Sequence, residues 1–169
     1  MPVKSGQLSI DVPALCGELQ SLQRRRVFVL KSRNMLMNRL RAGVAGELGY
    51  QVKLEETDRK RLFEEAEALI EDIREGKSED FLYHAIVRTS LVGIDNFDSL
   101  KEDYEKEMVR IAKQLPVARW VKQQSQRGFG ILFLGIVVGE TGDLSNYAGP
   151  AKVWRRMGCA PHTFDGKTL

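Results

Sequence analysis

The sequence predicts an all-α fold, in which long antiparallel or coiled-coil helices are followed by a small domain of the helix-hairpin-helix type. Three observations lead to this prediction. Apolar residues recur at alternating steps of three and four along most of the first 120 residues. Nothing in the first 125 residues alternates with period two for long enough to indicate a strand. The last third places a glycine-flanked apolar turn, Gly128-Phe129-Gly130, between two helical patterns.

The first predicted helix is also the longest. Asp11 is a candidate N-cap and Pro13 falls in the first turn. The apolar stripe then continues for about thirty-five residues, until Gly49 ends it. Arg26 and Arg33 interrupt this stripe, so we expect both to face an acidic partner or solvent at the edge of the seam.

Three further helices are predicted before residue 115. Thr57 begins the second helix and Gly76 ends it, and a third begins near Ser78. Residues 93–98 read as a turn, after which Ser99 opens a fourth helix. We therefore predict a long-helix coiled-coil region at residues 11–114 and a helix-hairpin-helix domain at residues 115–169.

Composition and charge bound the function. Charged residues make up 29% of the 169 residues and hydrophobic ones 43%, as in ordinary soluble proteins. Seven basic residues and no acidic one lie at positions 24–41, eleven carboxylates dominate positions 55–80, and basic residues prevail again after 115. Two basic zones indicate polyanion contact at both ends of the chain. A solvated helix surface also explains the acidic zone.

Several classes of function are not indicated. The apolar run from Phe129 to Val138 has about half the length that a bilayer span needs, and the first residues lack the core of a signal peptide. We therefore expect a cytoplasmic protein without membrane contact. The two cysteines, like the two histidines, are far apart, so neither a disulfide, a metal site nor a cofactor is expected.

The Gly-Phe-Gly segment is the first candidate site. We expect it to turn with positive φ while Phe129 fills the core and a wholly buried helix follows. The amides of the turn would then point outward at the positive end of that helix and accept a phosphate, with Lys122 and Arg127 beside them. Two alternatives stay open: residues 131–138 form a short buried strand, or the glycines only join two core helices.

A short basic helix is the second candidate site. Pro150 fits the first helical position and Gly158 the end. Lys152, Arg155 and Arg156 would share one exposed face. The apolar side chains expected to face inward are Val153, Trp154 and Met157. A basic face beside a phosphate-binding turn is typical of a nucleic-acid footprint, although a merely solvated helix face has the same pattern.

We thus predict eight nucleic-acid-binding residues: Lys122, Arg127, Gly128, Phe129, Gly130, Lys152, Arg155 and Arg156. No catalytic residue is predicted, because the carboxylates of Glu140 and Asp143 have no positioned partner and read as turn and cap residues.

The segment GFGILFLGIVVGETGDLSNYAGPAKVWRRMGCAP resembles the C-terminal domain of a class of bacterial insertion-sequence transposases. In that class a RuvC-like domain with four acidic catalytic residues is joined to a helical domain containing a helix-hairpin-helix. LQSLQRRRVFVLKSRNMLMNRLRAGV is similar to the coiled-coil helix that links the two domains. The resemblance covers residues 15–48 and 115–166. It implies a role in DNA recombination by a mobile element.

This chain departs from the class in two ways. We expect this chain to lack the RuvC-like domain, and Asp165-Gly166 stands where the class has the nucleophilic serine of a Ser-Gly pair. We therefore expect a transposase-like protein or transposase fragment that binds DNA, or structured RNA, without catalysis of its own. A separate chain would supply the chemistry, and the long helices would form a homodimer. No side chain is placed to read bases. The alternative is a helical oligomerisation protein that binds no nucleic acid.

Overall fold

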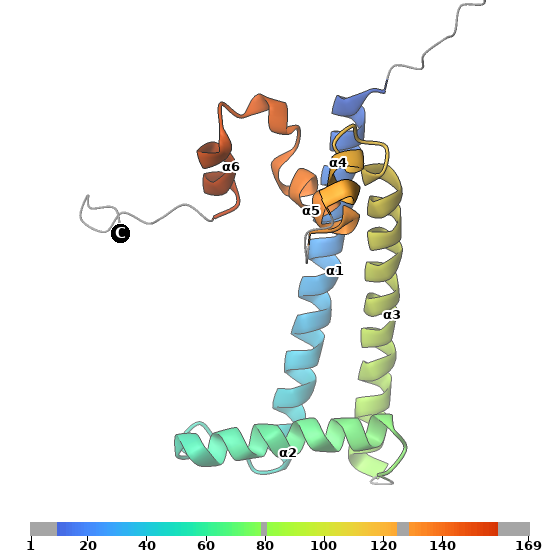
Figure 1. The fold of residues 1–169 in the computed structure, drawn as a ribbon. Helices are drawn as coiled ribbons and strands as arrows, with labels where there is room; N and C mark the ends of the chain where they lie inside the picture. Colours follow the sequence, from blue (N-terminus) through green and yellow to red (C-terminus); the bar gives the residue numbers. More distant parts are fainter. Residues whose placement is uncertain (1–9, 79–80, 125–128, 159–169) are drawn as a thin grey trace, which may run out of the picture. The chain divides into compact units, whose positions relative to one another are not determined.

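The computed structural model describes residues 10–78, 81–124 and 129–158 (Figure 1). All regular elements in these ranges are helices, which confirms the all-α fold. The α-helices are α1 (Val12–Glu47), α2 (Glu56–Arg74), α3 (Phe81–Ala112), α4 (Ala118–Gln124), α5 (Ile131–Thr141) and α6 (Pro150–Arg156); η1 (Leu144–Asn146) is a 3₁₀ turn.

The chain forms two compact units, each with its own core. Unit 2 is the continuous segment Val27–Glu102, and unit 1 combines the residues up to Arg26 with those from Asp103 onward. Both long helices therefore contribute one segment to each unit. The two units meet at Arg26/Val27 and at Glu102/Asp103, not between residues 114 and 115, where the sequence predicts a domain boundary. That boundary stays a prediction.

Local signals define the ends of α1 as the sequence predicts. The Asp11 carboxylate accepts a hydrogen bond from the Ala14 amide at 3.0 Å, which satisfies one of the amides that a helix start leaves unpaired. Gly49 adopts φ +95° just after the last turn, and the amide of Tyr50 bonds back to the carbonyl of Ala45. The expected length of about thirty-five residues is confirmed by the observed 36.

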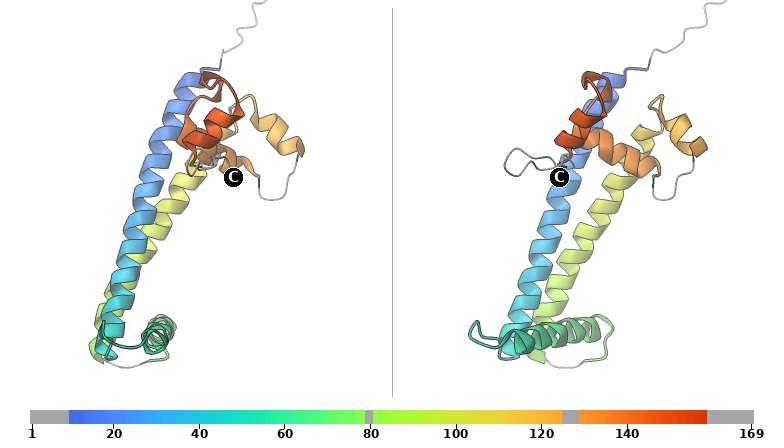
Figure 2. Two further views of the ribbon diagram at one scale, coloured as in Figure 1. Left: turned by 90° about the vertical axis from the view of Figure 1, so that its left-hand side faces the viewer. Right: turned by 60° about the vertical axis from the view of Figure 1, so that its left-hand side comes forward.

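Within unit 2, the segments of α1 and α3 run antiparallel and α2 crosses them (Figures 1 and 2). Ion pairs link these helices at their edges, between Arg33 and Asp98 at 2.9 Å and between Arg41 and Glu67 at 3.1 Å. The buried core beneath them is made by Leu40, Val44, Ala45, Ala66, Ile70, Ile73, Val87, Leu91 and Ile94.

The predicted turn at residues 93–98 is wrong, because α3 runs through it without a break. Gly93 lies inside the helix, where an added Cβ would stand 3.1 Å from Cδ2 of Leu36. Ile94 beside it is completely buried. The glycine therefore gives α1 room to pack against α3, and this tertiary contact outweighs the weak helix propensity of the Gly-Ile-Asp-Asn segment.

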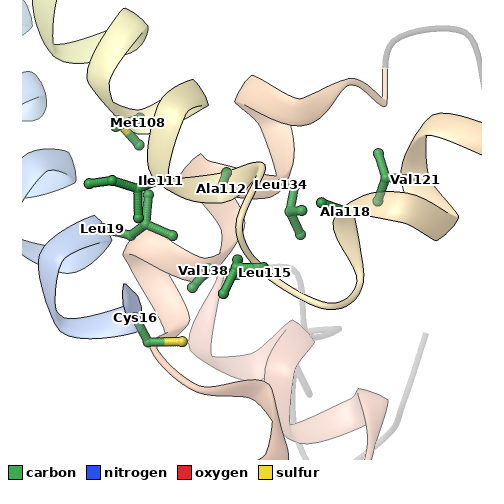
Figure 3. Close-up of a cluster of buried hydrophobic side chains, with 10 residues drawn as sticks. All are labelled: Cys16, Leu19, Met108, Ile111, Ala112, Leu115, Ala118, Val121, Leu134 and Val138. Atoms are coloured by element: carbon green, nitrogen blue, oxygen red, sulfur yellow. The ribbon is translucent and has the colours of Figure 1, made fainter. Parts of the chain in front are cut away.

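Unit 1 is held together by a second apolar core (Figure 3). It combines side chains from α1, α3, the connection to α4, α4 itself and α5: Cys16, Leu19, Met108, Ile111, Ala112, Leu115, Ala118, Val121, Leu134 and Val138. Burial raises the pKa of the Cys16 thiol, and the nearby carboxylate of Asp143 adds to this effect. Cys16 is therefore a packing residue rather than a reactive one.

Residues 131–141 are helical, as one of the alternatives predicted, but the helix α5 is less buried than expected. The strand interpretation is therefore wrong. The helix is not wholly buried, because the Phe133 side chain is 43% exposed and Glu140 is exposed as well. Only the face containing Leu134 and Val138 is buried, because the short helix lies on one side of the unit 1 core.

Candidate nucleic-acid interface

The Gly-Phe-Gly segment is described only from Phe129 onward, so Arg127 and Gly128 lie outside the described residues. Phe129 packs against the core of unit 1, which agrees with the expectation that it fills this core. Its ring meets that of Phe133 edge to face, with 5.0 Å between the ring centres. The packing of Phe129, rather than this local ring contact, connects the start of α5 with the core.

Gly130 does not have the expected positive φ. It is the N-cap of α5 with φ −102° and ψ −179°, an extended conformation that any residue adopts, and an added Cβ would meet nothing within 4 Å. Its carbonyl accepts the first helical hydrogen bond, from the amide of Leu134 at 3.0 Å. Because Gly130 needs no special backbone freedom, a β-branched residue here would not distort the turn.

The start of α5 still has chemistry that suits an anion. Gly130 has no side chain to cap the helix, and the positive end of the helix dipole lies at these first amides of α5. Lys122 lies in the last turn of α4 and is exposed. The structure thus places Lys122, Phe129 and Gly130 on the neighbouring ends of α4 and α5.

The basic helix α6 forms as predicted, with Pro150 at its first position and Gly158 at φ +74° after its end. Lys152, Arg155 and Arg156 are all exposed. None of the three forms an ion pair within the part of the chain that the structure describes. Their charges are therefore available to an external anion.

The expectation that the apolar side chains of α6 face inward is wrong for two of them. The Trp154 side chain is 59% exposed and that of Met157 is 36% exposed, whereas Val153 is half-buried. The reason is that α6, only seven residues long, contributes no residue to the buried core of unit 1. Trp154 therefore exposes its indole on the side of α6 opposite to the three cations, since it is two residues from Lys152 on the helix.

The basic zone of α1 separates into two groups that the sequence alone does not distinguish. Arg26 and Arg33 pair with Glu105 and Asp98, so the acidic partner is the one of the two expected surroundings that these seam arginines have. Arg41 pairs with Glu67 as well. The other four are exposed and have no ion pair within the described ranges: Arg24, Arg25, Lys31 and Arg39. The helical phase of the seam was the signal that could have identified this second group.

The carboxylates near η1 have structural partners. The Glu140 carboxylate accepts a hydrogen bond at 2.8 Å from the side-chain amide of Gln23. Asp143 caps the 3₁₀ turn by accepting a bond from the Ser145 amide at 2.9 Å, and this bond lowers the pKa of Asp143. The interpretation of Asp143 as a cap residue is therefore confirmed.

Neither a metal site nor a membrane span is found in the described part of the chain. Within these ranges, no three His, Cys, Asp or Glu side chains are grouped so that they could hold a metal ion. No helix there combines the length and apolar character needed to cross a membrane. Compared with known protein families, curated proteins and solved structures, the chain has no match.

Proposed function

We propose that this chain binds the phosphate backbone of a nucleic acid through the basic face of α6, assisted by the start of α5. The observation that supports the proposal best is the triplet Lys152, Arg155 and Arg156. All three side chains are exposed, and none is neutralised by a described carboxylate. Cations arranged in this way release counterions from a polyanion when they bind it, and this release is a main source of affinity for nucleic acids.

Trp154 adds an aromatic surface to the same helix. The Trp154 side chain is 59% exposed, although burying so large an apolar side chain would be favourable. An exposed indole on the helix that carries these cations suits a nucleic acid, because bases stack on aromatic rings. The start of α5 suits the same ligand, because the positive end of this helix follows Gly130. Lys122 is exposed in the last turn of α4.

The resemblance to insertion-sequence transposases gives the proposed role its context. We propose a transposase-like, DNA-binding protein that works in the cytoplasm and has no catalytic activity on this chain alone. Structured RNA is the other ligand with the same phosphate chemistry. In this role the protein would hold nucleic acid for a catalytic chain, and any selectivity would come from the shape of the ligand, because backbone contacts carry no sequence information.

The charge of α6 can be tested by a salt titration. The double variant Arg155→Ala, Arg156→Ala should bind a labelled DNA duplex more weakly than the wild type, whatever the duplex sequence. The slope of log affinity against log salt should fall by about one unit for each phosphate that is no longer neutralised, and therefore by about two units. Fluorescence anisotropy at several salt concentrations measures both quantities, and a hairpin RNA in a parallel titration separates the two ligands.

The matched control removes the same charge from another surface. Lys60 and Arg61 are exposed on α2 and form ion pairs with Glu64 and Glu65. The double variant Lys60→Ala, Arg61→Ala should bind as the wild type does. The proposal is wrong if the α6 variant keeps the affinity and the salt slope of the wild type, or if the two double variants are weakened equally.

A further inference from the structure

Unit 2 contains an apolar groove between α1 and the first half of α3. Its volume is about 240 Å³. Leu36, Leu40 and Val44 line it from α1, and Ile86 and Val87 line it from α3. Ile86 is 63% exposed, although it belongs to this apolar lining. Apolar surface that remains open in a groove is typical of a binding site for another protein segment.

Three residues of α1 along this groove are symmetrically placed. Arg39 and Glu47 both line it, and Gly43, which also lines it, is four residues from each. Residues four apart lie on the same face of a helix, so the three form one row with a cation at one end and a carboxylate at the other. The backbone positions of Arg39 and Glu47 are about 12 Å apart along the helix axis, given a rise of about 1.5 Å per residue.

The two charges have no partner within the described part of the chain. Arg39 and Glu47 are exposed and form no ion pair there. Gly43 is exposed, and a Cβ added to it would meet nothing within 4 Å. A row with opposite charges at its ends and a bare backbone at its centre allows another helix to approach closely.

We propose that the groove binds a second copy of this chain, with the two α1 helices antiparallel and a twofold axis passing beside Gly43. In this arrangement Arg39 of each copy faces Glu47 of the other, and the two Gly43 residues face one another at the crossing point. An interface of this kind is self-complementary, as a symmetric dimer requires. The second copy would cover the groove and Ile86. This site is independent of the proposed nucleic-acid contact on α6.

The occupant follows from the sequence of the row itself. Any apolar helix could fill the groove, but only a partner with opposite charges four residues either side of a small residue would neutralise both ends. The antiparallel copy of the row has this pattern. Charged groups at the edge of an interface mainly determine which partner and which orientation are selected, so a reversal of the charges is the most direct test.

Single charge reversals should prevent self-association. In Arg39→Glu two carboxylates would face each other at both ends of the row, and in Glu47→Arg two cations would. Each variant alone should dimerise at least about tenfold more weakly than the wild type, because like charges in an interface disfavour association. The double variant Arg39→Glu, Glu47→Arg restores opposite charges at both ends and should dimerise as the wild type does. Sedimentation velocity of nuclease-treated protein measures the dimer fraction.

A mixture of the two single variants provides the decisive comparison. Each copy whose row ends in two carboxylates would then face a copy whose row ends in two cations. Both contacts become favourable, so a heterodimer should form where neither variant dimerises alone. Lys31→Glu reverses a charge of α1 outside the groove and should leave the dimer unchanged.

Circular dichroism verifies that every variant keeps its helices. The proposal is overturned if the wild type is monomeric at a concentration of about 100 µM, well above the micromolar range in which weak specific dimers form. It is equally overturned if neither the double variant nor the mixture recovers the dimer.

Discussion

Two glycines of α5 lie at different distances from their neighbours, and this difference predicts opposite effects of the same substitution. At Gly139 an added Cβ would stand 2.6 Å from Cβ of Gln23 and 3.0 Å from the carbonyl oxygen of Leu19. At Gly135 the nearest atoms, in Met108 and Ala112, are 3.5 Å away, which is an ordinary contact. The first glycine is therefore required by the packing of α5 on α1, whereas the second is not.

Gly139→Ala should lower the free energy of unfolding by about 1–3 kcal/mol, since the backbone of α1 must shift to admit the methyl group. Gly135→Ala should leave it unchanged or raise it by up to about 1 kcal/mol, because alanine has the higher helix propensity. Urea unfolding followed by circular dichroism measures both. Equal effects of the two substitutions would show that α5 does not approach α1 closely at Gly139.

On the scale of elements, α1 and α3 are joined in unit 1 by an ion pair that little solvent reaches. Arg26 and Glu105 are 2.7 Å apart, with side chains 16% and 18% exposed. The pair between Arg61 and Glu65 within α2 is similar in distance, at 2.9 Å, but its side chains are 62% and 47% exposed. Burial therefore distinguishes two ion pairs of comparable geometry.

Arg26→Ala should cost about 2 kcal/mol of the free energy of unfolding, because it removes the guanidinium that pairs with the largely buried Glu105 carboxylate. Arg61→Ala should cost less than about 0.5 kcal/mol, as is usual for exposed pairs within one helix. The same urea titration measures both values. Equal losses of stability in the two variants would show that the Arg26–Glu105 pair is not shielded from solvent. The same conclusion would follow if high salt reduced both losses equally.

The elements also show which parts of the fold a sequence can predict. The ends of α1 and α6 are predictable because they depend on local signals: an Asp11 cap, a proline at the first position, and glycines at positive φ just after the last turn. The continuity of α3 is not predictable in this way. It depends on the contact between Gly93 and Leu36, which are far apart in the sequence, and no local pattern records such a contact.

The candidate interface is predictable to the same limited extent. The exposure of Lys152, Arg155 and Arg156 follows from their charge and helical spacing. The exposure of Trp154 does not, because an apolar residue faces inward only where the rest of the fold provides a core, and α6 contributes nothing to the buried core of unit 1. Gly130 illustrates a similar limit, since an extended φ and a positive φ are equally open to glycine.

On the scale of the whole molecule, the two cores divide the stabilising contacts between two units. The ion pairs Arg33–Asp98 and Arg41–Glu67 each join two helices of unit 2 and involve no residue of unit 1. The edge-to-face contact between Tyr50 and Phe63, with ring centres 5.1 Å apart, lies within this segment as well. Unit 2 is continuous in sequence, whereas unit 1 needs two separate segments of the chain. Only unit 2 can therefore be produced as a single uninterrupted piece.

Residues 27–102 alone should fold into helices and unfold cooperatively on heating, because their core and their ion pairs are internal to the segment. Within this piece, Ile94→Ala should cost about 2–5 kcal/mol, since the Ile94 side chain is completely buried and its removal leaves a cavity. Val92→Ala is the matched control on the same helix. Its side chain is 61% exposed, so the change should stay within about 0.5 kcal/mol. Circular dichroism during thermal and urea unfolding measures both. A coil spectrum of the piece, or equal losses of stability from the two substitutions, would mean that the core around Ile94 forms only with the help of unit 1.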